Sequence, residues 1–595
     1  MSASPIRLKT FASDSSESQF TLGTAQDYES IGTHATFIEQ CVIGLFANVN
    51  RLVDWLVPDS ALPFQLKDAL KSFSDKSNRH VQYNDFAWGP GPDYDGLRDI
   101  KTSGAARFLN GIVSHLNSFS RVQTSRTWVA GHLNGIVVDP SSRRAKPSDQ
   151  RHPDVVLLDY PRRNREAEWA EVLVVGEVNH SGEDAHIHLF EDVHQILMHQ
   201  VDRRFVLGFT LVGKHFTFYL FDRAGGISTS QIDIHEAPET FLRTIGGMAY
   251  GDGGVLGYDP TISLAHGVVT VNDKRYKMVE PLFRADKIRG RGTTVFRVRR
   301  WQRQYVLKDA WVVDRGQPTE AEILRCAGNL SGIARLEDDE EVRFDGAVDS
   351  TGRRRSSVGL YAHQNLENRV HRRLVLKDCG MPLHTFATLR ELLGAFIDGI
   401  GAHSVLYYEK QILHCDISAS NIMLLDNGSP PGKRRGLLVD FDHAIKVGFP
   451  STRIRGTLPY VAIDLLLCRS GLTHQASHDL ESFFYVLCCI CASSNGPHTP
   501  VIQKDTFLRY WKQDANPVVV GLAKLDHVRT DTAFNEQVLS GFQPYCHPLK
   551  QCARDLRRLF FGWTCQSISS LYAAEVKHAS VIDVLRKAMR DLPPE

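Results

Sequence analysis

The chain has 595 residues, of which 42% are hydrophobic and 23% charged, and its formal net charge is +1. This length is too great for a single hydrophobic core, so we expect two domains. The near balance of 69 basic against 68 acidic residues argues against a nucleic-acid partner, because binding DNA or RNA normally requires a basic excess.

Residues 1–30 are rich in serine and acidic side chains, and we expect them to be disordered. They contain no apolar signal core, and the longest apolar run of the chain, near Phe483 to Ala492, is about half of the ~20 residues that a membrane helix requires. We therefore expect an intracellular protein, cytoplasmic or nuclear, without a membrane contact. Cysteines in apolar runs, such as Cys488, Cys489 and Cys491, are interpreted as buried thiols.

Residues 31–265 are predicted to form an N-terminal α/β domain. Apolar residues at helical spacing predict a helix over 35–55. Strands are predicted over 153–158 and 171–177, followed by a helix over 190–200 and a hairpin over 204–221. The glycine-rich passage over 251–260 favours a domain boundary soon after it, which we place near residue 270.

Two carboxylates of this domain have a suggestive arrangement. Asp154 opens one predicted strand and Glu177 ends the next, which resembles the PD-(D/E)xK nuclease fold, where two carboxylates bind a divalent metal and a lysine assists the attacking water. Asn179 stands in the lysine position. We therefore expect a degenerate restriction-endonuclease-like fold kept for structure or binding, or no such fold, rather than an active nuclease.

The second domain, predicted over 270–595, begins with three antiparallel strands over 282–289, 290–298 and 304–308. A helix over 318–327 opens with proline and acidic residues. In the charged segment that follows, the basic run Arg353 to Ser357 is interpreted as a solvated loop, with a phosphorylation or localisation signal as the alternative. A long helix over 386–410 leads into His414.

The pattern H-x-D-x-x-x-x-N over His414 to Asn421 is followed by an apolar strand that ends in Asp440. A hairpin joins the two segments, so we expect Asn421 and Asp440 to lie close together, within reach of Mg²⁺, with Asp416 in reach of a substrate hydroxyl. Phosphoryl transfer from a magnesium nucleotide needs this set: one carboxylate orients the attacking hydroxyl, and an amide and a second carboxylate hold the metal.

Lys308 ends the apolar strand V-L-K, downstream of Gly290 and Gly292. A lysine in this position can bridge nucleotide phosphates and pair with a carboxylate of the next helix. Glu320 is the best partner, and Glu322 is the alternative. The residues expected to bind the nucleotide and its metal are therefore Gly290, Gly292, Lys308, Glu320, Asn421 and Asp440.

The motifs H-C-D-I-S-A-S-N-I, V-D-F-D-H-A, G-T-L-P-Y-V-A-I-D-L-L and H-D-L-E-S-F-F-Y-V-L together resemble the fungal-type protein kinase domain family. The resemblance extends upstream to the segments around Asp154 and Glu177 and covers most of residues 150–490. It implies an α+β class with a two-lobed protein kinase fold, the small lobe over about 275–380 and the large lobe over about 381–595. It also implies ATP and Mg²⁺ as cofactors and a protein serine or threonine as the phosphate acceptor.

Several positions depart from the protein kinase pattern, among them Ile463 and Asp464 in place of the Pro and Glu of A-P-E. Val295 replaces the third glycine of the glycine-rich loop, and Cys415 replaces an arginine that often pairs with an activation-loop phosphate. Ser418 stands where Ser/Thr kinases often have a lysine touching the γ-phosphate, and Asp442 replaces the glycine of D-F-G. A pseudokinase that serves as a nucleotide-binding or interaction module is therefore the alternative to an active enzyme.

A small-molecule kinase of the aminoglycoside or choline type shares H-x-D-x-x-x-x-N but lacks a peptide-docking segment. The segment Gly456 to Leu466 resembles such a docking segment, and Asp479 is predicted to accept hydrogen bonds from the catalytic-loop backbone. The sequence thus favours a protein substrate. It leaves the physiological substrate, the regulation and the oligomeric state open.

Overall fold

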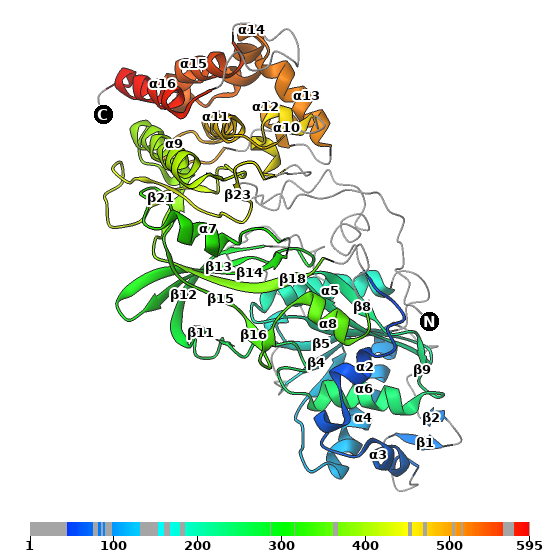
Figure 1. The fold of residues 1–595 in the computed structure, drawn as a ribbon. Helices are drawn as coiled ribbons and strands as arrows, with labels where there is room; N and C mark the ends of the chain where they lie inside the picture. Colours follow the sequence, from blue (N-terminus) through cyan, green and yellow to red (C-terminus); the bar gives the residue numbers. More distant parts are fainter. Residues whose placement is uncertain are drawn as a thin grey trace.

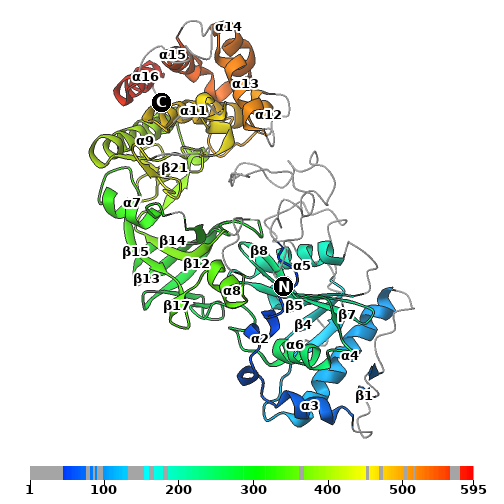
Figure 2. The same ribbon diagram turned by 45° about the vertical axis from the view of Figure 1, so that its right-hand side comes forward.

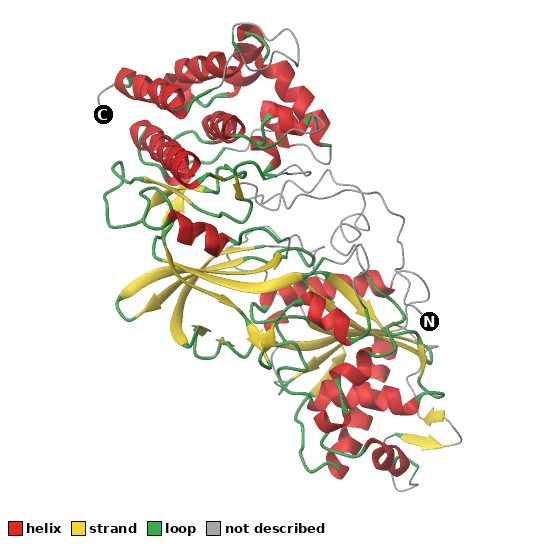
Figure 3. Ribbon diagram, in the orientation of Figure 1, coloured by secondary structure: helices red, strands yellow, loops and turns green. Residues whose placement is uncertain are grey.

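The computed structural model describes residues 45–74, 81–84, 87–89, 98–130, 153–159, 167–178, 185–285, 287–314, 316–360, 367–449, 455–467, 473–501, 506–512, 516–562 and 576–593. An N-terminal sheet with helices, a second sheet and a helical C-terminal part follow one another along the molecule (Figure 1). Strands dominate the middle and helices dominate the C-terminal end (Figure 3).

The N-terminal sheet has the strand order β3-β4-β5-β6-β7-β8, with β9 paired to β7. Only β5 and β6 pair in parallel, and helix α5 connects them; the other pairs are antiparallel. The bounds are β3 (Thr127–Ala130), β4 (Val155–Leu158), β5 (Val172–Val178), α5 (Ala185–His199), β6 (Val206–Val212), β7 (His215–Asp222), β8 (Gly225–Ser228) and β9 (Ile232–Asp233). The predicted strands, helix and hairpin of residues 153–221 are therefore present.

Helices cover both faces of this sheet. Alternate residues of β4 belong to different core clusters: Val156 packs with α5, whereas Val155 packs with α4 (Arg98–Phe119) and α6 (Pro238–Tyr250). Because both faces are covered, β5 is buried at every position. The smaller elements α2 (Leu52–Leu56), α3 (Leu66–Ser72), β1 (Gln82–Asn84) and β2 (Ala87–Gly89) complete this part.

The helix predicted over 35–55 is wrong over residues 45–51, and only its end is helical, in α2; residues 35–44 lie outside the described residues. The chain is extended before α2: Phe46 donates its backbone N–H to Gly226 and Val49 to Ser228, both at 2.9 Å. The apolar side chains there are buried against β8 and not along a helix face. Apolar spacing alone did not separate the two arrangements, because a short apolar run fits either.

Asp154 has a structural contact in this sheet. It is 2% exposed, and its Oδ2 accepts the backbone N–H of Val178 at 3.0 Å. Glu177 is fully buried in β5. Asn179, the third position of the nuclease-like pattern, lies outside the described residues, and the nuclease-like resemblance stays a prediction.

The second sheet is antiparallel throughout, with the order β10-β11-β12-β13-β14-β18-β15. Its last five strands form a unit in which helix α7 (Glu320–Ala327) follows β14. The bounds are β10 (Ile262–Ser263), β11 (Val268–Val271), β12 (Lys274–Arg284), β13 (Thr294–Arg300), β14 (Arg303–Val313), β15 (Leu336–Glu341) and β18 (Arg369–Leu376). The domain boundary near residue 270 remains a proposal, and β10 of the second sheet precedes it.

One strand prediction in this sheet differs from the structure, and one strand was not predicted. The first strand was expected over 282–289, but β12 runs from Lys274 to Arg284, and its largely exposed residues pair with β13. The acidic run of β15 also forms a strand, since Glu340 and Glu341 lie opposite Arg373 and Arg372 of β18. Opposite charges on facing strands stabilise a pairing that strand propensity does not favour.

The C-terminal part is built around α11 (Ala476–Ser493), which is buried along almost its whole length. Figure 2 shows α9 and α11 side by side beneath the last helices. The larger helices are α9 (Leu389–Lys410), α12 (Phe507–Lys512), α13 (Pro517–Val528), α15 (Lys550–Phe561) and α16 (His578–Asp591). Cys488, Cys489 and Cys491 are buried free thiols, as predicted. None of the helices in the described ranges is long and apolar enough to cross a membrane.

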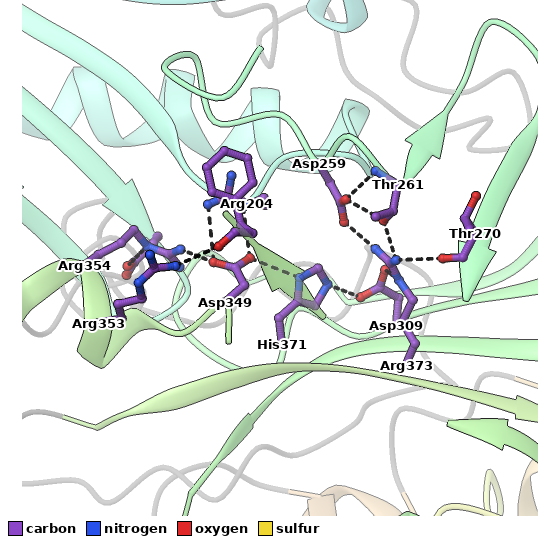
Figure 4. A network of polar contacts seen from close by, with 12 residues as sticks. Arg204, Asp259, Thr261, Thr270, Asp309, Asp349, Arg353, Arg354, His371 and Arg373 are labelled. Atoms are coloured by element: carbon purple, nitrogen blue, oxygen red, sulfur yellow. Dashed lines mark hydrogen bonds and ion pairs between the residues drawn. The ribbon is translucent and has the colours of Figure 1, made fainter. Parts of the chain in front are cut away.

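A buried network of charged side chains joins the N-terminal sheet to the second sheet (Figure 4). His371 of β18 bonds through its ring nitrogens to Asp309 at 2.5 Å and to Asp349 at 3.3 Å. Asp349 accepts a hydrogen bond from Arg204, just before β6, at 2.9 Å. Asp309 accepts one from Arg373 at 2.9 Å. The two sheets are thus connected by ion pairs as well as by the chain.

Helix α8 (Thr351–Ser357) contributes two arginines to this network. Arg355 donates to both oxygens of Asp222 in β7, at 2.7 and 2.9 Å, and Arg354 bridges Asp222 and Asp349. The two arginines are 1% and 4% exposed. The prediction of a solvated loop over Arg353 to Ser357 is therefore wrong, because the segment is helical and Arg354 and Arg355 are buried, although its other three residues are exposed. The sequence did not show this because the neutralising carboxylate lies more than 130 residues away.

We expect Asp222→Asn to lower the free energy of unfolding by about 3–5 kcal/mol, because it leaves buried guanidinium charges without their carboxylate. Chemical denaturation measures this change. Asp526→Asn is the matched control: Asp526 is 62% exposed and pairs with an exposed arginine, so the expected change is below about 1 kcal/mol. Equal effects of the two substitutions would contradict this account of the interface.

His371 makes the stability of the interface depend on pH. Burial lowers the pKa of His371, but Asp309 and Asp349 outweigh burial and raise it to about 9. A folded-state pKa above the unfolded value of about 6.5 contributes stability that is complete below pH 6.5 and lost as the pH rises through 9. Trp311, which stacks on the His371 ring, carries no charge. Arg373 lowers the pKa of His371, but by less than the two carboxylates raise it.

We expect the wild-type protein to lose roughly 3 kcal/mol more than His371→Gln between about pH 6 and 9.5. Free energies of unfolding at several pH values test this difference. The exposed His266, replaced in the same way, should leave the wild-type profile unchanged. Parallel profiles for the wild type and His371→Gln would show that His371 is neutral in the folded protein.

Candidate active site

Lys308 lies in β14 and is 7% exposed. Its Nζ contacts Glu320 Oε2 at 2.6 Å. Glu320 is the first residue of α7, and the N-cap Thr319 forms a capping box with Glu322. Because Glu322 binds the helix N-terminus, Glu320 is the glutamate of the pair that reaches Lys308.

Two further carboxylates surround the same ammonium group. Asp440 and Asp442 each lie 2.7 Å from Lys308 Nζ. Burial alone would raise the pKa of Asp440, but the charges of Lys308 and Arg291 outweigh burial and hold it below its usual value. Burial opposes the charged form of Lys308 too, and the carboxylates outweigh it and raise its pKa. Lys308 and Asp440 are therefore both charged at neutral pH. Glu320 differs from them, because burial raises its pKa and favours its protonated form.

Asp440 follows β22 (Gly436–Leu438), which pairs with β21 (Ile422–Leu425). The register places Asn421 opposite Val439, whose N–H donates to the Asn421 carbonyl at 3.1 Å. Asp440 has φ of +64°, a strained backbone conformation for a residue other than glycine. Phe441 is buried and its N–H donates to Glu320 at 3.0 Å. The hairpin thus brings Asn421 and Asp440 to one end, as predicted.

Asp416 lies in a separate group of contacts. Its Oδ1 accepts hydrogen bonds from the Thr457 N–H at 2.8 Å and from the Thr457 hydroxyl at 2.7 Å. Asn421 Nδ2 donates to Asp416 Oδ2 at 3.1 Å and to its carbonyl at 2.8 Å. The carboxylate is therefore oriented from both sides. Sequence reasoning assigned Thr457 to a docking segment and missed this contact.

The backbone before Asp416 is held by Asp479 at the start of α11. The N–H groups of His414 and Cys415 donate to Asp479 Oδ2 at 3.0 and 3.2 Å, the contact predicted from the sequence. Cys415 has φ of +62°, so these bonds stabilise a strained turn. Burial lowers the pKa of His414, so the ring is neutral and bridges Val439 and the Asp416 N–H.

The oxygen atoms of this site fit a hard divalent cation. Glu320, Asp440 and Asp442 bring ligand atoms within 4.8 Å of one another, and Mg²⁺ prefers carboxylate and amide oxygens. Asn421 directs its Nδ2 to Asp416, which leaves its Oδ1 as the atom that can coordinate a metal. The Asp440 carboxylate thus belongs to a group of oxygens that suits Mg²⁺, and the Asn421 Oδ1 is a further candidate ligand.

Gly290 and Gly292 form the turn between β12 and β13, with φ of +143° and +51°. Between them, Arg291 extends to the acidic cluster and lies 2.5 Å from Asp442. The sequence indicated the two glycines but not the arginine. An arginine between two glycines, shortly before Lys308 in the sequence, was the signal that could have indicated this contact.

Comparison with known proteins gives one family. The family model described as fungal protein kinase matches residues 152–491. A search of curated protein sequences gives no match. The matched residues include every strand of the N-terminal sheet except β3, the whole second sheet, and the loops that carry Asp416, Asn421 and Asp440. The chain therefore belongs to the fungal protein kinase family.

Proposed function

We propose that the protein is an ATP-dependent protein serine/threonine kinase that uses Mg²⁺. Family membership supports a kinase-like function. The observation that carries the finer proposal is the separation of roles: Lys308 lies between Glu320 and Asp440, while Asp416 is oriented independently by Thr457 and Asn421.

In this proposal each side chain has one task. Lys308 binds the ATP phosphates, Glu320 positions Lys308, and the turn of Gly290 and Gly292 covers the phosphates. Asp416 accepts a hydrogen bond from the substrate hydroxyl and orients it for attack. Asn421 and Asp440 hold Mg²⁺, which neutralises phosphate charge when bound. Because positioning and electrostatics supply most of the catalysis, these residues suffice without covalent chemistry.

A pseudokinase is the second candidate, and one observation favours it. The carboxylates Asp440 and Asp442 are occupied by the protein's own cations, Lys308 and Arg291. A metal must compete with these cations. If a metal never displaces Lys308 and Arg291 from these carboxylates, the site would bind partners or nucleotide without turnover.

The experiment combines labelled ATP, Mg²⁺ and generic protein acceptors with a thermal-shift titration of ATP. We expect phosphate transfer to serine and threonine together with stabilisation by ATP. ATP stabilisation without transfer to the protein itself or to any acceptor would instead favour the pseudokinase. An intracellular location, cytoplasmic or nuclear, is part of the proposal, since ATP is abundant inside cells.

A further inference from the structure

Arg291 is a charged residue of the site that the proposed mechanism does not use. It is 7% exposed. Its guanidinium lies 2.5 Å from Asp442 and 3.7 Å from Asp440, the two carboxylates that also contact Lys308. The acidic cluster therefore holds two cations side by side, one from β14 and one from the glycine-rich turn.

The N-terminal sheet anchors this turn. Gly290 donates its N–H to the carbonyl of Arg223, the residue that follows β7, at 3.0 Å. The Arg223 guanidinium donates in return to the Lys287 carbonyl at 2.8 Å. Ile288 packs in a core cluster with Phe221 and α5 of the N-terminal part. The backbone before Arg291 is thus held by residues of the other sheet.

The turn is also fixed from the side of β14. The Trp311 N–H donates to the Arg291 carbonyl at 2.7 Å. At Gly292 an added Cβ would lie 2.3 Å from Arg223 Nε, and φ is +51°. Only glycine there permits both the left-handed backbone and the close packing of Arg223. The backbone of Arg291 is therefore constrained on both sides before any ligand binds.

We propose that Arg291 is a phosphate-binding residue of the nucleotide site and that the N-terminal domain positions it through Arg223. The inference rests on the proposed binding of ATP. A guanidinium can bind two phosphate oxygens at once, which makes arginine well suited to this task. Asp442 and Asp440 contact the guanidinium in the structure, and phosphate oxygens would replace them as its partners.

This role accounts together for two departures from the protein kinase pattern. Ser418 stands where a lysine would touch the γ-phosphate, and Arg291 supplies a positive charge beside Asp440 and Asp442. Asp442, in place of glycine, gives Arg291 and Lys308 a carboxylate partner until the nucleotide binds. The family match covers Arg223, Arg291 and Asp442.

Equilibrium binding of ATP and of adenosine to the full chain tests the proposal. We expect Arg291→Met to weaken ATP binding roughly 10- to 100-fold, the loss of one or two charged hydrogen bonds, with adenosine affinity unchanged. Arg291→Lys keeps the charge and should recover part of the affinity. The exposed Arg299, on the neighbouring strand β13, is the matched control, and Arg299→Met should bind both ligands as the wild type does.

Gly292→Ala tests the positioning by Arg223. The added Cβ must displace Arg223 or the turn, so we expect a lower ratio of ATP to adenosine affinity although Arg291 itself is intact. A melting temperature for each variant shows that it is folded. An unchanged ratio in Gly292→Ala would refute the positioning role.

The outcomes separate this inference from the proposed function. An Arg291→Met protein that binds ATP as well as or better than the wild type, or that loses adenosine equally, overturns the phosphate-binding role. If the wild type also transfers phosphate, the kinase proposal survives that result. A wild type that binds ATP through Arg291 but transfers none refutes turnover and supports the inference. A wild type that binds no ATP refutes both.

Discussion

We expect Asp416→Asn to lower kcat for phosphate transfer roughly 10²- to 10⁴-fold, the usual contribution of a positioned acid–base group. The amide has the shape of the carboxylate but is a poor acceptor for the substrate proton. No described contact joins Asp416 to Lys308 or Arg291, so the KM for ATP should remain near the wild-type value. Steady-state kinetics at saturating protein substrate measure both constants.

Asp526→Asn, an exposed substitution of the same kind, is the control for this prediction. It should retain the wild-type kcat. A folded Asp416→Asn protein with unchanged kcat would show that Asp416 is not the residue that orients the hydroxyl. A rise in the KM for ATP with kcat retained would instead assign Asp416 to nucleotide binding.

Lys308→Met is the second substitution with a large expected effect. It removes the cation that contacts Glu320, Asp440 and Asp442 within 2.7 Å. Three buried carboxylates then share only Arg291. We expect the free energy of unfolding to fall by about 3–5 kcal/mol, together with loss of ATP binding and of phosphate transfer.

The same substitution makes a prediction about metal. Because the ligand atoms of the three carboxylates lie within 4.8 Å of one another, Mg²⁺ should stabilise Lys308→Met more than it stabilises the wild type. Thermal unfolding with Mg²⁺ and with a chelator tests this. Lys377→Met is the control, because Lys377 is 44% exposed and its removal should change stability by less than about 1 kcal/mol. Lys308→Met with wild-type stability would contradict the ion-pair geometry.

The relative placement of the proposed catalytic residues could be predicted from the sequence because their geometry is local. Asn421 and Asp440 flank two short strands of one hairpin, and the hairpin register alone brings them together. Lys308 and Glu320 are only 12 residues apart, on a strand and the helix that follows it. Short loops leave few ways to arrange such elements, so spacing and residue type were sufficient.

The contacts that the sequence did not indicate are long-range. Thr457 reaches Asp416 across 41 residues and Arg291 reaches Asp442 across 151. Arg354 and Arg355 were predicted to be solvated because the sequence does not indicate Asp222 as their partner. The three residues meet only when the two sheets pack together. Pairing of buried charges depends on tertiary structure, so residue type and local pattern cannot predict it.

Phosphoamino-acid analysis tests the central proposal most directly. Wild-type protein and Asp416→Asn are incubated with labelled ATP, Mg²⁺ and a protein mixture that offers serine, threonine and tyrosine, and ATP binding is measured for both. We predict labelled phosphoserine or phosphothreonine with the wild type and a loss of label with Asp416→Asn, although both bind ATP. Equal labelling by the two proteins, label on tyrosine alone, or ATP binding by the wild type without any transfer would contradict it.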